Sequence, residues 1–129
     1  MGALILDASV LIGLLDTADA HHEPAVEQVQ AADLARRSLI TPASAYSEAL
    51  VAFARADRVG EAREAIAAMG ITVHAITASV AERAAELRAQ HERLRLPDAL
   101  VLATARELGG DLLAFDDRLN AVAHRDDKP

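Results

Sequence analysis

Short apolar runs alternate with longer stretches in which apolar residues recur every three or four positions. The short runs predict strands at Ala3–Leu6, Leu39–Thr41, Ile71–Ile76 and Asp111–Phe115. The longer stretches predict helices over about Pro24–Ala35, Ala45–Ala56, Gly60–Ala68, Ser79–Glu92 and Pro97–Leu108. Strands that alternate with helices pair in parallel through right-handed crossovers. We therefore predict a three-layer α/β/α fold with a central, mainly parallel sheet, in one domain over residues 1–129.

Local signals predict where the helices begin and end. Pro24 suits the first position of a helix, and Ser44 is predicted to cap the next one. The segment Ser79–Glu82 matches a capping box, and Gly109 is a helix stop. Two turns are also predicted, an apolar one at Val10–Leu15 and a short helical one after Asp116-Asp117. The inward-facing residues of the Pro24 helix are predicted to be Val26, Val29 and Leu34.

Composition excludes several classes of protein. The sequence has no cysteine, so disulfides, thiolate catalysis and cysteine-bound zinc or iron–sulfur sites are excluded. No apolar run approaches the roughly 20 residues needed to cross a bilayer. The N-terminus lacks the charged, apolar and small-residue pattern of a secretion signal. We expect a soluble cytoplasmic protein that does not contact membranes.

The net charge and the low aromatic content argue against two common modes of nucleic-acid binding. The formal net charge is −7, from 20 acidic and 13 basic residues, which argues against passive phosphate binding. Aromatic residues make up only 2% of the chain, so base stacking on aromatic platforms is not expected to dominate. An enzyme that meets phosphate through bound cations is compatible with both features.

Four acidic residues have placements that a surface role explains poorly. In α/β folds sites gather at the carboxyl ends of strands, and there Asp7 closes the first predicted strand and Asp116 the last. Glu48 lies inside a helix on a face that is predicted to be apolar, and Asp98 lies in the first turn of another. The apolar neighbours at helical spacing are Ala45, Val51 and Ala52 for Glu48, and Val101 and Leu102 for Asp98.

Each acid alone has an ordinary explanation, because aspartate favours turns and helix N-termini. Four acids brought together repel one another unless cations lie between them. Hard divalent cations such as Mg²⁺ or Mn²⁺ suit an all-carboxylate site. Zinc is not indicated, since the histidines are scattered and are most simply interpreted as surface or loop residues. They are His21, His22, His74, His91 and His124.

The order of these motifs resembles the PIN-domain family over nearly the whole chain. Leu4–Ile12, with Asp7 and Ser9, resembles the family's first motif, an apolar strand followed by Asp-x-Ser/Thr. Arg95–Ala105 resembles the third acidic motif and is the most specific match. Leu112–Asp116 resembles the last motif, and Glu48 matches the helical glutamate between them.

Length and motif order are similar to the VapC toxins of bacterial type II toxin–antitoxin modules. The resemblance implies an endoribonuclease that depends on Mg²⁺ or Mn²⁺, is commonly homodimeric, and is inhibited by a VapB-like antitoxin that places an arginine in an acidic cleft. The RNA substrate would be tRNA or rRNA, cleaved to leave a 5′-phosphate and a 3′-hydroxyl. The metal-binding and catalytic residues would be Asp7, Glu48, Asp98 and Asp116.

The chain also departs from the family pattern. Ser9 is expected to support a carboxylate or a bound water, but Ala114 stands where many members have a hydroxyl residue. Asp117 adds an acid that could share the role of Asp116. The tail 122–129 is a poor match for the family's closing strand. Arg95 and Arg118 are either surface residues or phosphate contacts.

Two other classes of function stay open. A non-catalytic PIN-like module would bind RNA or protein without cleaving it, and such modules typically lack one or more of the acids. A phosphatase or phosphotransfer domain would use Asp7 as nucleophile. That class is disfavoured, because Ser9 replaces its usual second acid and the only lysine is Lys128 in the tail.

Overall fold

Four parallel strands form the centre of the computed structural model, which describes residues 2–126. The strand order is β3-β2-β1-β4, so the first strand lies between the second and the last. All three strand pairs are parallel, which confirms the predicted parallel sheet. The strands are β1 (Leu4–Leu6), β2 (Leu39–Pro42), β3 (Ile71–His74) and β4 (Asp111–Leu113).

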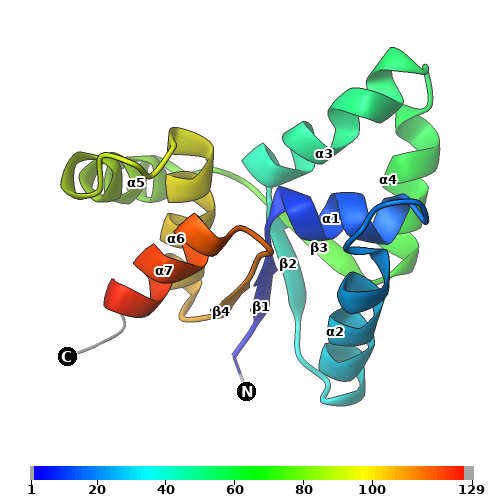
Figure 1. Cartoon of the computed structure of the whole chain (residues 1–129), viewed down its shortest axis with the longest axis horizontal. Helices are drawn as coiled ribbons and strands as arrows, with labels where there is room; N and C mark the ends of the chain where they lie inside the picture. Colours follow the sequence, from blue (N-terminus) through cyan, green and yellow to red (C-terminus); the bar gives the residue numbers. More distant parts are fainter. Residues whose placement is uncertain (1, 127–129) are drawn as a thin grey trace.

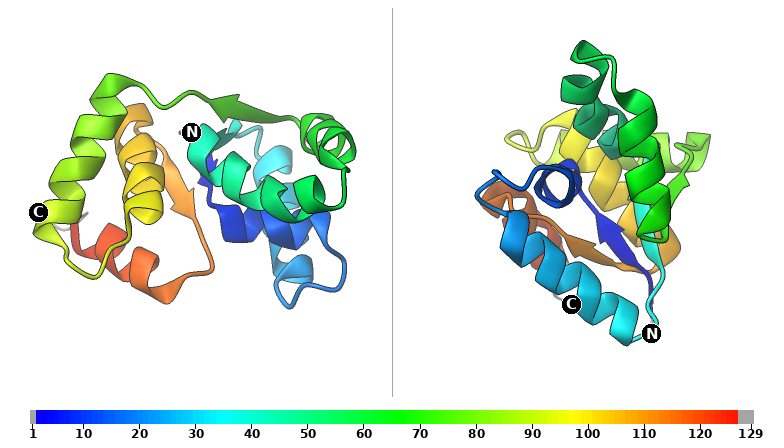
Figure 2. Two further views of the ribbon diagram at one scale, coloured as in Figure 1. Left: turned by 90° about the horizontal axis from the view of Figure 1, so that it is seen from above. Right: turned by 90° about the vertical axis from the view of Figure 1, so that its right-hand side faces the viewer.

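Helices cover both faces of this sheet, as the three-layer prediction requires (Figures 1 and 2). On one side lie α1 (Ala8–Leu15), α2 (His22–Leu34), α3 (Ala43–Arg55) and α4 (Val59–Ala68). On the other side lie α5 (Ala78–Gln90), α6 (Leu96–Leu108) and α7 (Asp117–Asp126). Within residues 2–126 no helix is long and apolar enough to cross a membrane.

The central strand contributes side chains to both cores, because successive residues of a strand point to opposite faces. Leu4 and Leu6 pack in the cluster formed with α1, α2 and α4. Ile5 points to the other face and packs with Val101 and Ala105 of α6, in a cluster that Ala45, near the start of α3, also joins. A strand buried on both faces is a continuous apolar run, which is why the first strand is recognisable in the sequence.

The path of the chain through the sheet reverses beside β1. The connections through α1–α4 carry the chain from β1 to β2 and then to β3 on one face. The connection through α5 and α6 then returns on the other face and adds β4 on the far side of β1. In open α/β sheets, ligands bind at the carboxyl ends of the strands where the order reverses. The boundary between β1 and β4 is such a point.

Two predicted helix caps are wrong. Helix α3 begins at Ala43 directly after Pro42, whose extended backbone ends β2, and the hydroxyl of Ser44 makes no capping bond. Helix α5 is capped by Thr77, whose side-chain oxygen accepts from the Val80 N–H at 3.2 Å. Ser79 therefore lies inside the helix, where its hydroxyl donates to Glu107 at 2.7 Å. In both cases the residue with extended backbone, not the strongest capping side chain, sets the boundary.

Three helical predictions also need correction. Val10–Leu15 is part of an eight-residue helix, α1, rather than a turn. The segment after Asp116 is a ten-residue helix, α7, rather than a short turn. Leu34 is 85% exposed, because the inward stripe of α2 shifts onto small residues. That stripe consists of Ala25, Val29 and Ala32.

The C-terminal tail, residues 122–129, lies only partly within the described residues. Residues 122–126 belong to α7, and the other three lie outside the described residues.

Three of the strands are shorter than predicted, whereas β2 extends one residue further, to Pro42. β1 begins at Leu4, and β3 ends at His74 rather than Ile76. β4 ends at Leu113, so Ala114 and Phe115 belong to the loop that leads to α7. Asp116 consequently does not follow the strand directly. That loop carries it from the end of β4 to the start of a helix.

Candidate functional site

Asp7 occupies the reversal point of the sheet, directly after β1. Its side chain is only 6% exposed. One carboxylate oxygen accepts from the Ala8 N–H at 2.7 Å, which caps α1, and the other accepts from the Ser9 hydroxyl at 3.0 Å. These two bonds hold the carboxylate in one orientation. Each oxygen has two lone pairs, so each keeps one acceptor position for a further partner.

Ser9 connects this carboxylate to the loop after β4. Its oxygen accepts from the Phe115 N–H at 3.2 Å while its hydroxyl donates to Asp7. The Asp7 N–H also donates to the Leu113 carbonyl at 3.1 Å, which joins the ends of β1 and β4. The loop that carries Asp116 is thus tied to the residue at the end of the neighbouring strand.

Asp116 directly precedes α7 at the same edge. One of its carboxylate oxygens accepts from the N–H groups of Arg118 at 2.8 Å and Leu119 at 3.3 Å, so Asp116 caps the helix. The bonds to these two N–H groups engage only one oxygen of the carboxylate. The capping role fixes where Asp116 lies, and the second oxygen is available to a cation or to water.

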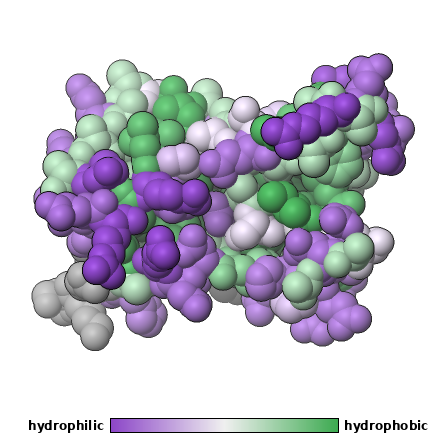
Figure 3. All heavy atoms as spheres, turned by 45° about the horizontal axis from the view of Figure 1, so that its top comes forward, coloured by the Kyte–Doolittle hydropathy of each residue, from purple (hydrophilic) through white to green (hydrophobic). Residues whose placement is uncertain are grey.

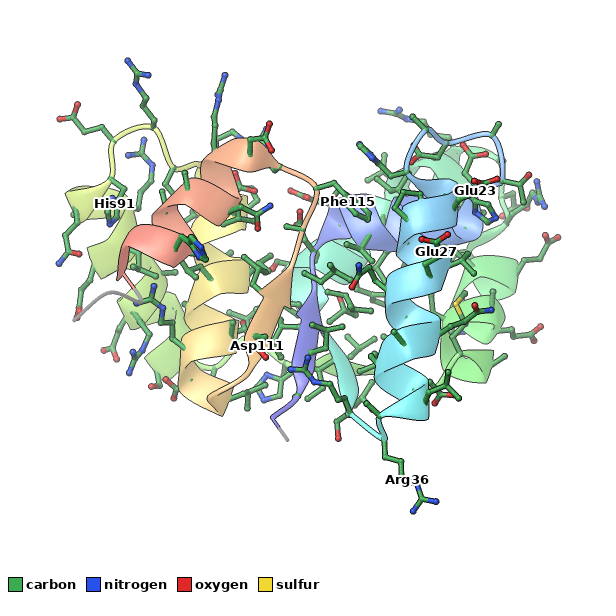
Figure 4. All side chains as sticks on the ribbon, turned by 60° about the horizontal axis from the view of Figure 1, so that its bottom comes forward. Glu23, Glu27, Arg36, His91, Asp111 and Phe115 are labelled. Atoms are coloured by element: carbon green, nitrogen blue, oxygen red, sulfur yellow. The ribbon has the colours of Figure 1, made fainter. Side chains whose placement is uncertain are left out.

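A stacked pair of rings, which the sequence analysis missed, packs against this loop. The rings of His21 and Phe115 stack with centroids 4.6 Å apart and planes inclined by 16°. Figure 4 shows Phe115 between the two helical layers, at the loop between β4 and α7. The pair joins the α1–α2 connection to the residue before Asp116. No local sequence signal links His21 to Phe115, because they are far apart in the chain.

Asp98 and Glu48 approach the site from α6 and α3. The two helices meet through the apolar cluster that contains Ala45 and Val101. Asp98 lies one turn before Val101, in the first turn of α6, and is 8% exposed. Glu48 lies about one turn after Ala45 and is exposed.

The prediction that Glu48 lies on an apolar face is wrong, because Val51 and Ala52 are exposed. The buried residues of α3 are Ala45 and Ala49, so the apolar stripe is narrower than the sequence suggests. Glu48 lies at its edge, next to the solvent. A long, exposed side chain in this position can reach the other acids without the cost of a buried charge.

The charges of the four acids act on one another. Burial raises the pKa of Asp7, the bonds from Ala8 and Ser9 partly offset this, and the charges of Asp98 and Asp116 raise the pKa further. Burial also raises the pKa of Asp98, which Asp116 raises further. The pKa of Glu48 is raised by partial loss of hydration and by the charges of Asp7 and Asp98. The sequence-predicted acids therefore form one electrostatic cluster, the acid cluster (Asp7, Glu48, Asp98 and Asp116).

Two arginines lie beside the acid cluster. Arg95 precedes α6, and its Nε donates to a carboxylate oxygen of Asp98 at 3.4 Å. Its charge lowers the pKa of Asp98 and of Glu48, opposing the effect of burial. Arg118 is exposed and contributes its backbone N–H to the Asp116 cap.

Asp117 is placed apart from the acid cluster. It is exposed and lines a cavity of about 880 Å³ between α6, β4 and α7, with Arg106, Asn120 and His124 among the other lining residues. Asp116, and not Asp117, is among the charges that raise the pKa of Asp7. A role for Asp117 in place of Asp116 is not supported by this geometry.

The donor set of the acid cluster fits a hard divalent cation. All four side chains offer carboxylate oxygens, which Mg²⁺ and Mn²⁺ prefer. Within residues 2–126, however, no three acidic or histidine side chains are already close enough together to hold an ion. Carboxylates that repel one another are expected to stand apart until a cation draws them together. Figure 3 shows this end of the molecule, which is hollowed between the α5–α6 side and the projecting α3–α4 pair.

Comparisons with known proteins agree with this fold. The PIN domain family model matches residues 4–125, and the chain belongs to that family. A search of curated proteins finds no match. Mycobacterium tuberculosis VapC20, described as a sarcin-ricin loop cleaving toxin, superposes with a TM-score of 0.72 at 25% identity over 92% of this chain and 94% of that chain. A chain of a toxin–antitoxin complex from Klebsiella pneumoniae superposes with a TM-score of 0.73 at 23% identity over 92% and 91%.

The raised pKa of Asp7 gives a prediction for stability. A carboxyl group whose pKa is higher in the folded than in the unfolded protein opposes folding when ionised. The penalty is fully present above the folded-state pKa and disappears as the pH falls toward the ordinary value of 3.8. Asp7→Asn should therefore be more stable than the wild type by about 1 kcal/mol near neutral pH in EDTA, and the gain should shrink in acid.

Urea unfolding of both proteins between pH 7 and pH 4 measures this difference. Glu27→Gln is the matched control, because it removes one charge from an exposed position of α2. It should stay within about 0.5 kcal/mol of the wild type across the range. An Asp7→Asn variant that is less stable than the wild type at neutral pH in EDTA would show that the ionised Asp7 carboxylate does not oppose folding.

Proposed function

We propose that this protein is an endoribonuclease that requires Mg²⁺ or Mn²⁺, and that it acts as the toxin of a VapBC-type toxin–antitoxin system. The observation that carries the proposal is the electrostatic coupling of Asp7, Glu48, Asp98 and Asp116 at the reversal point of a PIN-domain sheet. Buried acids with raised pKa values, such as Asp7 and Asp98, are costly to keep ionised, and functional sites are where such costs concentrate.

The four acids of the acid cluster would have different roles in binding cations. Asp7 and Asp98 are buried and would hold one cation with Glu48, whose exposed side chain can move to complete the site. Asp116 would bind a second cation or an ordered water through its oxygen that does not cap α7. When bound, a divalent cation lowers the pKa of water and offsets the charge of the phosphodiester. Ser9 keeps the Asp7 carboxylate oriented during these changes.

RNA as substrate is supported by the comparisons rather than by the acids themselves. The family consists largely of nucleases, and VapC20 is described as cleaving the sarcin-ricin loop. An acidic protein that meets the RNA backbone through bound cations needs few basic or aromatic residues, which agrees with the composition of this chain. Which RNA is cut, whether tRNA or rRNA, stays a prediction, as does the homodimer implied by the resemblance.

The other two classes of function receive less support. A non-catalytic PIN-like module has no need to gather four acids that repel one another. A phosphotransfer enzyme with Asp7 as nucleophile needs an accessible carboxylate oxygen, whereas Asp7 is buried and both of its oxygens accept hydrogen bonds.

An antitoxin partner is supported by a groove that leads to Glu48. The groove has a volume of about 400 Å³ and lies between α1 and α3, where Ile12, Leu15, Ala52 and Phe53 give it an apolar lining. Ile12 is partly exposed at this groove, and exposed apolar side chains that share a groove mark interaction sites. A peptide segment packed in this groove could place a basic residue over the acid cluster, where charge-assisted bonds are strong.

The nuclease proposal predicts a defined pattern of activity. Purified protein should cleave RNA in Mg²⁺ or Mn²⁺ and stop in EDTA. Asp7→Asn and Asp98→Asn should each lose at least ~100-fold in rate, as expected when a cation ligand is disabled. Glu27→Gln should cleave at the wild-type rate. A gel assay on labelled RNA measures all three, and full activity in EDTA or in either aspartate variant would refute the mechanism.

The partner proposal predicts a complex with the small protein encoded beside this gene. Expression of the chain alone should slow growth, and co-expression should restore it. Ile12→Glu should weaken the purified complex by at least ~10-fold, because it buries a charge in an apolar groove. Leu34→Glu is the control, since Leu34 is also an exposed aliphatic residue but lies outside the groove. Equal affinities of both variants, measured by calorimetry, would place the partner elsewhere.

A further inference from the structure

Arg95 is a cation that lies at the edge of the acid cluster without being buried in it. Its Nε contacts Asp98 at 3.4 Å, and 69% of its side chain is exposed, against 11% for that of Asp98. A single long contact made by an exposed arginine contributes little to stability. The guanidinium is therefore held near the acids but is easily released.

The position of Arg95 gives it two possible partners. In the absence of cations, its charge compensates two of the acids, Asp98 and Glu48. A divalent cation bound to Asp98 would take over that compensation and would repel the guanidinium. The exposed side chain can then turn toward the hollow at this end of the molecule, where a phosphodiester has to approach the acids (Figure 3). A guanidinium binds phosphate with two parallel hydrogen bonds.

We propose that Arg95 is a positioning residue for the RNA backbone, and that it competes with the divalent cation for Asp98 in the free protein. This inference rests on the proposed nuclease function and assigns the phosphate contact of the same site. Asp98 thus has one partner at a time. Arg95 pairs with Asp98 before the cation binds and with a substrate phosphate afterwards.

If Arg95 competes with the cation and also contacts the substrate, replacing it should strengthen the binding of the cation and weaken the binding of RNA. Arg95→Ala should bind Mn²⁺ more tightly than the wild type without RNA, by roughly 2- to 5-fold, because a competing charge is removed. The same variant should have a several-fold higher KM for RNA and a salt dependence of KM that is weaker by about one phosphate contact. If Arg95 had only a structural role, its substitution would weaken the binding of Mn²⁺ and of RNA together.

Two further variants separate charge from geometry. Arg95→Lys keeps the counter-charge but loses the two-pronged donor, so its Mn²⁺ affinity should be near that of the wild type while its KM for RNA stays raised. Arg93→Ala is the matched control, because Arg93 is an exposed arginine of the same loop. It should leave Mn²⁺ affinity unchanged.

Calorimetric titration with Mn²⁺ tests the competition without any nuclease activity. Tighter binding by Arg95→Ala than by the wild type and Arg93→Ala supports it, and equal or weaker binding overturns it. Steady-state cleavage then tests the phosphate contact, which an unchanged KM for Arg95→Ala would overturn. If the wild type cleaves no RNA, the proposed function and the phosphate contact both fail. The Mn²⁺ titration still decides whether Arg95 competes for Asp98.

Discussion

Repulsion among carboxylates at one edge of the sheet is the constraint on which the rest of this structure depends. Burial raises the pKa of Asp7 and of Asp98, and the charge of Asp116 raises both further. Partial loss of hydration and the charges of Asp7 and Asp98 raise the pKa of Glu48. A carboxyl group whose pKa is raised by folding opposes folding at neutral pH, where it is ionised. The fold has to supply compensation that leaves the carboxylate oxygens open to a cation.

Helix N-termini provide much of that compensation. Asp7 caps α1, Asp116 caps α7 and Asp98 lies in the first turn of α6, so three of the four acids meet the positive end of a helix. Each such interaction stabilises a carboxylate by about 0.3–1 kcal/mol. The arrangement follows from the topology, since the carboxyl ends of β1 and β4 lie side by side at the reversal point and each leads into a helix. Glu48, the acid without a helix N-terminus, is the exposed one.

The sequence predicts the fold well and singles out the candidate acids, for a physical reason. Strands buried on both faces are continuous apolar runs, and an aspartate at the end of such a run, as at Asp7, is visible without coordinates. Asp98 is visible because a proline marks the start of its helix. The motif order also indicates the family, which the match over residues 4–125 confirms.

The sequence does not predict features that depend on contacts between distant segments. The stack of His21 on Phe115 and the bond from Phe115 to Ser9 join loops that no local pattern relates. The exposure of Val51 depends on how α3 sits against α6, so the environment of Glu48 was predicted wrongly. The pairing of Arg95 with Asp98 follows the ordinary spacing of a helical ion pair, but its position beside the other acids requires the tertiary fold.

Acids from four separate segments of the chain would form one cation site. A crystal structure of the wild-type protein grown with Mn²⁺, with anomalous differences collected for manganese, is the decisive measurement. We expect an anomalous peak within coordination distance of Asp7 and Asp98, with Glu48 or Asp116 drawn in to complete the ligand set. A well-occupied manganese site elsewhere on the molecule, with these carboxylates left apart, would contradict it.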